Sequence, residues 1–355
     1  MLFIKKDQPM KRIFIASLTI LAVFTAGNSF AQMDKHFSMF TATPVYLNPA
    51  TAGFAEQQLQ LFTNFRSQWL TVTEDPYRTM SASVDWRMLD PEATKAANFM
   101  GAGVNFYNDR AGISNYTTNV ITFPVSYALQ VGVQDHLSFG LQPAFYQRSV
   151  NGDNLTWDNQ WTGVEFDQGM DNNELMLNQN LNITRFDMAA GVYWEKYFEK
   201  GSRINVGLAG HHLTKQRVNI LSDDSKLFRK VTLHGEGTFK TTNTNVEIKP
   251  AILAFIQGPN KALTFGTAFR FAFKPQSQHT GYFNNMHLNL GSYFRVGDAI
   301  IASAALEMHT LSLGMAYDLN VSRLNVASKG VGAMEFFLRY RMNYEGRTLA
   351  DPTIH

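Results

Sequence analysis

The chain of 355 residues contains no cysteine, few charged residues and almost no long apolar stretch. The missing cysteines exclude disulfide scaffolds, thiolate zinc sites, iron–sulfur clusters and cysteine nucleophiles. Charged residues make up 17% of the chain, against about 25% in an ordinary globular domain. Outside the N-terminus no stretch approaches the ~20 apolar residues of a spanning helix, which excludes a polytopic helical membrane protein. Aromatic residues, in contrast, are abundant at 13%.

The N-terminus has the three parts of an export signal. Lys11 and Arg12 precede an apolar stretch over 13–25, and Ser29-Phe30-Ala31 places small residues where signal peptidase cleaves. We expect residues 1–31 to be a signal peptide, with 1–9 an upstream extension if Met10 is the initiator. A retained signal anchor is the alternative. Residues 1–31 carry a net charge of +3, so their removal changes the total from +2 to −1 and leaves no basic field for nucleic acid.

Apolar residues alternate with small or polar residues along the mature chain. Between 311 and 321 every second residue is apolar and the others are Ser, Gly, Ala, Asp and Asn; similar alternation recurs at 334–344 and 262–271. A period of two is typical of strands with one apolar face. These segments reach ten residues, with aromatics toward their ends, which is typical of a transmembrane β-barrel. A soluble β-sandwich, with strands of ~5–6 residues, is the alternative.

The periodicity therefore predicts an all-β fold, a transmembrane antiparallel β-barrel of about 14 strands with long extracellular loops. The expected strands are 57–72, 77–86, 99–107, 117–129, 135–149, 183–197, 202–211, 227–238, 244–256, 260–272, 280–295, 298–307, 310–319 and 333–344. An even number suits a bacterial single-chain barrel. The mature chain then divides into an N-terminal periplasmic or lumen segment (32–56), the barrel (57–344) and a C-terminal tail (345–355).

Connection lengths predict which end of the barrel faces outward. With both termini in the periplasm, the odd-numbered connections lie outside and are expected to be the long ones. The odd-numbered connections 150–182, 212–226 and 320–332 are long, whereas most even-numbered ones are short. The exception is 87–98, where we expect a shifted strand boundary or a short periplasmic helix at Pro91-Glu92-Ala93.

The segment before the first expected strand is too irregular to be a strand. Asn48-Pro49 favours a turn, and Gly53 provides a flexible corner. Such a segment can fold back toward the lumen of the barrel.

From the segment before the first expected strand onward, the chain resembles the PorP/SprF family of Bacteroidota outer-membrane proteins, which are associated with the type IX secretion system. Five motifs of the family occur in this chain in the family's order. The first is H-F-S followed by Y-L-N-P-A-x-A-G, at residues 36–38 and 46–53, and the second is Y-R-x-Q-W, which is Phe65-Arg66-Ser67-Gln68-Trp69 here. The others are N-D-x-A-G (Asn108-Asp109-Arg110-Ala111-Gly112), a Y-D segment (Tyr317-Asp318-Leu319) and a G-S-H-E-like turn (Gly332-Ala333-Met334-Glu335). The last match is degraded at Ala333 and Met334. The resemblance covers essentially the whole mature chain and implies an outer-membrane location.

Charged side chains fall on the expected lumen face of several strands. They are Arg66, Asp318, Glu335, Arg339 and Arg341. Opposite charges can pair to fill a narrow interior, or the same side chains can contact a partner, and we keep both readings for all five. Arg66, Asp318 and Glu335 are the predicted partner-binding residues among them. Asn108 to Gly112 is expected to form an outward turn in which Arg110 bonds carbonyl groups.

The longest connection, 150–182, is acidic and aromatic. It contains six carboxylates without any Lys or Arg, among them Asp158, Asp167 and Asp171, together with Trp157 and Trp161. Trp side chains dominate many interfaces, so we expect a protein-docking loop here. A solvated loop is the alternative. The spacing of a calcium loop is absent, and we expect no metal.

Catalytic motifs are absent from the sequence. There is no G-x-S-x-G, H-E-x-x-H, Walker loop or dinucleotide fingerprint. His211 and His212, followed by Asp223 and Asp224, resemble metal ligands, but neighbours on a strand point to opposite faces. We therefore expect no cofactor and no enzyme activity.

Three functions remain open. The family resemblance implies a barrel that receives, retains or helps deliver secreted proteins at the cell surface, often adhesins with C-terminal sorting domains. Its further partners would be type IX translocon or periplasmic ring components and outer-membrane lipid. A passive porin is the second hypothesis, and fourteen strands with a filled lumen argue against it. An outer-membrane hydrolase is the third.

Overall fold

A computed structural model describes residues 34–73, 75–88, 98–112, 114–150, 155–167, 169–171, 182–198, 201–215, 226–241, 245–273 and 286–343. The expected signal peptide (1–31) and tail (345–355) lie outside these residues. So do Pro91, Glu92 and Ala93 of the expected short helix, and Asp223 and Asp224.

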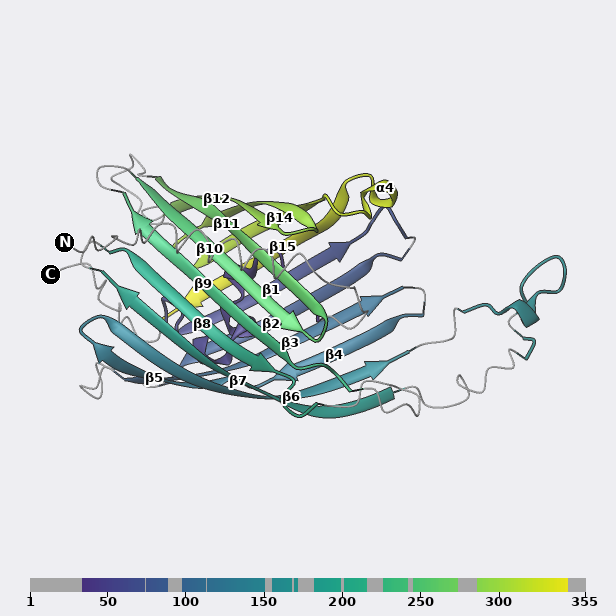
Figure 1. Cartoon of the computed structure of the whole chain (residues 1–355), viewed down its shortest axis with the longest axis horizontal. Coiled ribbons are helices and arrows are strands. Elements are labelled where there is room, and N and C mark those ends of the chain that lie inside the picture. The colour runs from purple at the N-terminus through teal and green to yellow at the C-terminus, as the bar shows by residue number, and fades with distance from the viewer. Residues whose placement is uncertain are drawn as a thin grey trace, which may run out of the picture.

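The described chain is all-β apart from five short helical turns (Figure 1). The strands are β1 (Leu59–Gln68), β2 (Tyr77–Arg87), β3 (Phe99–Ala111), β4 (Tyr116–Thr122), β5 (Val125–Gly132), β6 (Asp135–Ser149), β7 (Asn182–Tyr197), β8 (Arg203–His211), β9 (Lys230–Lys240), β10 (Val246–Gln257), β11 (Asn260–Phe273), β12 (Met286–Arg295), β13 (Ala299–Glu307), β14 (Leu311–Asn320) and β15 (Val331–Met342). Each strand is antiparallel to its neighbours, and β1 pairs with both β2 and β15. The sheet is therefore a closed barrel.

Two of the strands, β4 and β5, together form one position in the wall. Both lie between β3 and β6, separated by Phe123 and Pro124. Pro124 has no N–H to donate, and its carbonyl accepts a hydrogen bond from the amide of Gly103 at 2.9 Å. The expected single strand over 117–129 is thus interrupted by proline. The barrel has fourteen wall positions, and the predicted fold class is confirmed.

Burial alternates along the strands as the sequence pattern predicts. On β14, Ser312, Ala316 and Asp318 are buried in the lumen, whereas Leu313 and Met315 are exposed on the outer surface. Because alternate residues of a strand face opposite sides of the sheet, the outer wall is apolar and the inner wall small or polar. No helix among the described residues is long and apolar enough to cross a membrane.

The barrel has two different ends. At the terminal end β1 begins and β15 finishes, and the connections 133–134 and 198–202 join strands there. The connections 150–181, 212–229 and 321–330 leave from the opposite loop end, where 155–171 projects beyond the barrel (Figure 1). The two longest connections, 150–181 and 212–229, are thus odd-numbered, as expected. Length does not follow parity throughout: 258–259 at the loop end is a tight turn, and 88–98 and 274–285 at the terminal end are long.

The two ends can be distinguished by labelling, because the chain has no natural cysteine. Val164 at the loop end is 86% exposed and Val133 at the terminal end is 93% exposed, so Val164→Cys and Val133→Cys form a matched pair. With the loop end outside, we expect an impermeant maleimide to label Val164→Cys in intact cells. Val133→Cys should react only after the outer membrane is permeabilised. The reverse pattern would overturn this orientation.

Candidate functional site

Residues 34–56, termed the plug below, run through the lumen and lead into β1. Asp34 contacts the loop-end residues His212 and Gln257, whereas Gly53 contacts Asp85 near the terminal end. Three helical turns shape the plug: η1 (Phe40–Ala42), α2 (Pro44–Leu47) and η2 (Pro49–Thr51). The predicted folding of the N-terminal segment toward the lumen is confirmed.

Glycines in the wall make room for the N-P-A part of the plug. A Cβ added at Gly140 would lie 2.3 Å from the amide nitrogen of Ala50, and one at Gly101 would lie 2.1 Å from the carbonyl oxygen of Ala52. Both distances are far below van der Waals contact. Ala50 and Ala52 are accordingly 0% exposed. The plug backbone therefore lies directly on the backbone of β3 and β6.

Asn48 fastens this part of the plug to the wall. Its side-chain oxygen accepts a hydrogen bond from the amide of Ala50 at 2.9 Å, and its amide nitrogen donates to the carbonyl of Val192 at 3.0 Å. The space around it is again left by glycine, because a Cβ at Gly191 would lie 2.0 Å from the Asn48 Oδ1. A buried amide costs free energy unless it is hydrogen-bonded, and here both ends are.

Gly53 turns the chain out of the plug. Its φ of 77° lies in the left-handed region, which favours glycine. Its amide donates to a carboxylate oxygen of Asp85 at 2.7 Å, and its carbonyl accepts a hydrogen bond from Arg87 at 2.7 Å. The predicted corner at Gly53 is therefore held from β2 on both sides of the residue.

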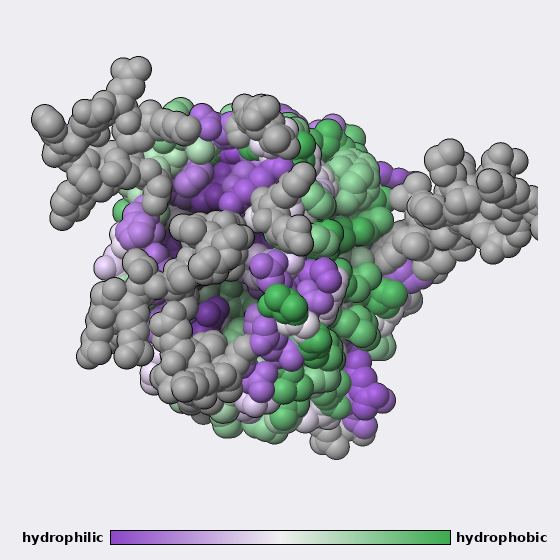
Figure 2. All heavy atoms as spheres, turned by 90° about the vertical axis from the view of Figure 1, so that its left-hand side faces the viewer, coloured by the Kyte–Doolittle hydropathy of each residue, from purple (hydrophilic) through white to green (hydrophobic). Residues whose placement is uncertain are grey.

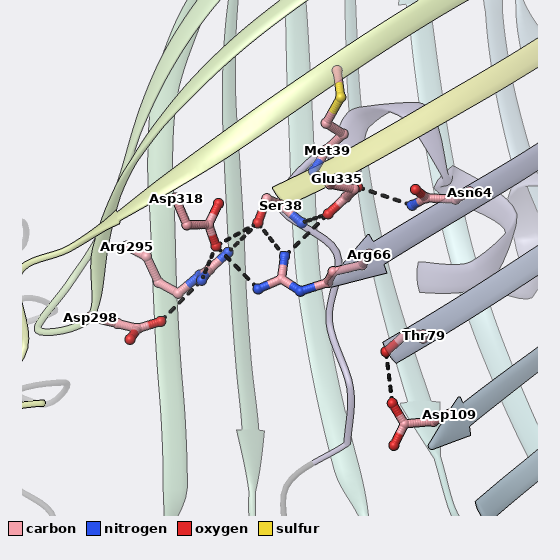
Figure 3. Close-up of polar contacts among 10 residues, drawn as sticks. All are labelled: Ser38, Met39, Asn64, Arg66, Thr79, Asp109, Arg295, Asp298, Asp318 and Glu335. Atoms are coloured by element: carbon pink, nitrogen blue, oxygen red, sulfur yellow. Dashed lines mark hydrogen bonds and ion pairs between the residues drawn. The ribbon is translucent and has the colours of Figure 1, made fainter. Parts of the chain in front are cut away.

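A buried ionic cluster holds the other half of the plug (Figure 3). Arg66 lies 3.1 Å from both Asp318 and Glu335, and Arg295 lies 3.2 Å from Asp318. The hydroxyl of Ser38 sits among them, accepting from Arg66 and Arg295 and donating to Asp318 at 2.7 Å. Glu335 also accepts the backbone amides of Ser38 at 2.7 Å and Met39 at 3.1 Å.

The cluster is compensated in charge. Arg66 and Arg295 face the buried carboxylates of Asp318 and Glu335, and Arg295 also pairs at 3.0 Å with Asp298, which is half-exposed. The side chains of Arg66, Asp318 and Glu335 are 5% exposed or less. Removing one member of such a buried pair typically costs about 3–5 kcal/mol, because the other charge is left uncompensated. The structure thus brings three of the five predicted lumen residues together, and all three contact the chain's own plug. Direct binding of a partner by them stays a prediction.

A second polar contact fixes the start of the plug at the loop end. His212 lies between Asp34 at 2.7 Å and Asp187 at 2.6 Å, and Lys230 is 3.5 Å from Asp34. Burial alone would lower the pKa of His212, but the two carboxylates raise it to about 9. Burial raises the pKa of Asp34, but His212 and Lys230 hold it well below its usual value. At neutral pH this contact is therefore a salt bridge.

The two neighbouring histidines do not point to opposite faces, as alternation on a strand would require. His211 is the last residue of β8, and its ring nitrogen lies 3.0 Å from the carbonyl of Leu47. His212 lies beyond the strand with a φ of 57°, so its side chain also reaches the plug. The expectation that the two histidines point to opposite faces was wrong, because the alternation of side chains stops where the strand ends. No metal-ligand cluster occurs among the described residues.

Apolar contacts join the plug to the wall opposite the glycines. Phe40 packs edge-on against Tyr293, with ring centroids 5.5 Å apart, within a cluster that includes Ile301. Ala42 packs against Phe62 and Phe337. The plug thus packs against wall strands on both sides of the lumen.

Toward the terminal end the lumen is polar. Arg203 pairs with Glu195 and Glu236, and Arg270 pairs with Glu247 and Glu307. These side chains are partly exposed, and Figure 2 shows a hydrophilic hollow at this end of the molecule. Arg341 extends the network to Glu56 of the plug.

The acidic connection contains a small hairpin at 155–171. Trp161 and Phe166 form an isolated bridge with their rings 4.9 Å apart, next to η3 (Asp158–Gln160). Trp161 and Phe166 are each 48% exposed, and Asp158, Asp167 and Asp171 are exposed as well. Trp157 is half-buried, so it supports the hairpin rather than forming its outer surface.

The N-D-x-A-G motif differs from the expected turn. Asn108, Asp109 and Arg110 belong to β3, and Gly112, with a φ of 65°, begins the turn. Asp109 faces the lumen, where it accepts a hydrogen bond from Thr79 and pairs with Lys35 of the plug at 3.3 Å. Arg110 donates to the side chain of Asn115. The strand continues further because β2 and β4 both pair with it.

The remaining motif residues shape the loop end. Trp69 follows Gln68, the last residue of β1, with a φ of 61°, and its ring packs against Tyr77 with centroids 4.9 Å apart. The pairing of β14 with β15 is irregular between Tyr317 and Leu319, around the inward-facing Asp318.

Several functional residues were not predicted from the sequence. Ser38, Arg295 and His212 complete the two polar contacts of the plug. Arg295 occupies an inward position of β12, so the alternation pattern contains the signal, but only the folded plug identifies its partners. The arrangement binds and orients a chain segment.

The glycine contact can be tested by a single methyl group. Gly140→Ala places a Cβ against Ala50, whereas Gly210→Ala meets Leu213 at an ordinary 3.5 Å. Overpacking typically costs about 1–3 kcal/mol. We expect Gly140→Ala to lower the unfolding temperature of the barrel, measured by the loss of its folded band on electrophoresis after heating. The backbone amides of residues 47–53, apart from Pro49, should also exchange their hydrogens faster. Equal effects of the two variants would contradict the contact.

The chain is similar to one known protein family and to several solved structures. The family described as "Type IX secretion system membrane protein PorP/SprF" matches residues 29–340. The chain also resembles the CymD monoaromatic hydrocarbon channel (10% identity, 88% of this chain and 95% of that chain, TM-score 0.47). It also resembles the Ralstonia pickettii toluene transporter TbuX (10% identity, 85% of this chain and 94% of that chain, TM-score 0.46). A Pseudomonas aeruginosa FadL homologue is similar as well (11% identity, 84% of this chain and 94% of that chain, TM-score 0.42). No curated protein sequence matches the chain.

The family match spans most of the barrel and the plug, including every motif named above. A closed antiparallel barrel with an apolar outer wall is one of the two architectures that can cross a bilayer. The chain is therefore an outer-membrane barrel, and it belongs to the PorP/SprF family of type IX secretion system membrane proteins.

Proposed function

We propose that this barrel receives secreted surface proteins and retains them at the cell surface. The cargo would be adhesins with C-terminal sorting domains. The observation that carries the proposal is the plug: it contacts both sides of the wall and binds to a buried ionic cluster. A barrel closed by its own chain is suited to presenting its loops to a partner.

A passive porin is less well supported. A porin needs a continuous aqueous path, and the polar hollow at the terminal end is separated from the loop end by the plug. A hydrolase would need a nucleophile beside a base. The buried charged groups of the lumen are instead engaged with one another and with the plug.

The hairpin at 155–171 is the docking surface in this proposal. It combines the exposed ring of Trp161 with the carboxylates of Asp158, Asp167 and Asp171. Aromatic anchors supply much of the binding energy of an interface, and charge mainly sets association rate. Trp157 contributes by supporting the hairpin from its base.

The ionic cluster enters the proposal through the plug. Arg66, Asp318 and Glu335 bind Ser38 and Met39, so a partner reaches them only when the plug leaves. At the terminal end, the polar hollow would face the periplasm. Translocon or periplasmic ring components would dock there.

The proposal is tested by adhesin retention. Trp161→Ala removes the exposed anchor, and Trp157→Ala with Trp161→Ala removes its support as well. Truncating a hot spot costs roughly 2 kcal/mol or more, so retention of a surface adhesin should fall severalfold. The measurement compares surface-bound with culture-released adhesin in cells that carry equal amounts of folded barrel.

Val133→Ala is the control, because it removes an exposed apolar side chain at the other end of the barrel. Asp158→Asn, Asp167→Asn and Asp171→Asn together should mainly slow association and flatten its salt dependence. Unchanged retention in the double Trp variant would remove the hairpin from the docking surface.

A further inference from the structure

Two arginines lie side by side on the outer wall near the loop end. Arg78 of β2 and Arg110 of β3 are directly opposite each other in the antiparallel register, and both are exposed. The intervening positions, Thr79 and Asp109, face the lumen and are hydrogen-bonded to each other at 2.7 Å (Figure 3). Since successive residues alternate between the two faces, Arg78 and Arg110 face outward.

This pair lacks a compensating charge. Among the described residues neither arginine forms an ion pair, and Arg110 donates only to the neutral side chain of Asn115. Like charges directly opposite on neighbouring strands destabilise the pairing. An arrangement of this kind is stable where an external anion lies between the two guanidinium groups.

Polar side chains surround the pair. The same row across the strands contains Thr117, which is half-buried and lies opposite Arg110, and Ser67, which is buried and lies opposite Arg78. The row beneath contains Asn108, whose side chain is hydrogen-bonded to Asn119 at 2.6 Å. Arginine forks and neighbouring hydroxyl groups are the donors that bind phosphate oxygens well.

The height of the pair corresponds to a membrane surface. Below it the outward residues of β2 are apolar from Met80 to Val84 and end at Trp86, which is exposed. From Arg78 to Trp86 is about 26 Å along the strand, or about 20 Å along the membrane normal for a tilted strand. The arginines therefore lie at one edge of the apolar band and Trp86 at the other.

We propose that Arg78 and Arg110 bind the phosphate of a lipid headgroup in the outer leaflet. With the loop end at the cell surface, as proposed above, the abundant phosphorylated lipid of that leaflet is of the lipid A type. Its acyl chains would lie along the exposed Met80 and Phe106. This lipid contact is separate from adhesin retention by the hairpin.

The test uses the full purified chain in phosphatidylcholine vesicles that contain either lipid A or its dephosphorylated form. Cations near an anionic lipid surface contribute about 1 kcal/mol each, so lipid A should bind roughly 30-fold more weakly to Arg78→Gln/Arg110→Gln. Arg78→Lys/Arg110→Lys keeps the charge but loses the planar fork, and we expect an intermediate affinity. Native mass spectrometry counts the retained lipid.

Lys226→Gln/Lys240→Gln is the matched control, because it removes two exposed cations elsewhere and should leave lipid A binding unchanged. Inorganic phosphate alone should not protect the protein against heat, whereas lipid A should. Equal retention of lipid A and its dephosphorylated form, or equal binding by the Gln and control variants, would overturn the proposal. Unchanged lipid A binding with lost adhesin retention would assign the pair to an acidic protein instead.

Discussion

The close contact between the plug and the barrel wall is the constraint on which the rest of the structure depends. A chain segment fits inside a fourteen-stranded lumen only where the wall residues facing it have no side chain. Gly101, Gly140 and Gly191 are such residues. The polar backbone groups of this segment must also form hydrogen bonds away from water. Beside the glycines, the side chain of Asn48 forms such hydrogen bonds with the plug and the wall. On the opposite side, Glu335 accepts hydrogen bonds from two backbone amides of the plug.

This contact divides the lumen into two different environments. Toward the loop end, Asp34, His212 and the Arg66 cluster hold the plug with buried salt bridges. Toward the terminal end, partly exposed charges such as Arg270 line a hydrophilic hollow. The two environments lie on opposite sides of one chain segment, which contacts both of them through buried or partly exposed charges.

The fold could be predicted closely from the sequence because a barrel strand repeats every two residues over ten or more positions. The same alternation located Arg66, Asp318 and Glu335 on the lumen face. It could not reveal that Ser38 joins them, since the plug has no periodicity and its path depends on contacts far apart in the chain. Alternation also misled at His212 and Phe123–Pro124, where the strand ends or proline interrupts it. Local geometry at such points overrides the pattern.

We infer that the plug closes the lumen of the intact protein. Single-channel conductance of the purified full chain in a planar bilayer tests this closure most directly. We expect no stable open level of porin size for the intact chain. Deletion of residues 32–53 should produce open levels or destabilise the barrel. A steady porin-sized conductance from the intact chain, unchanged by that deletion, would show that the plug leaves the lumen open.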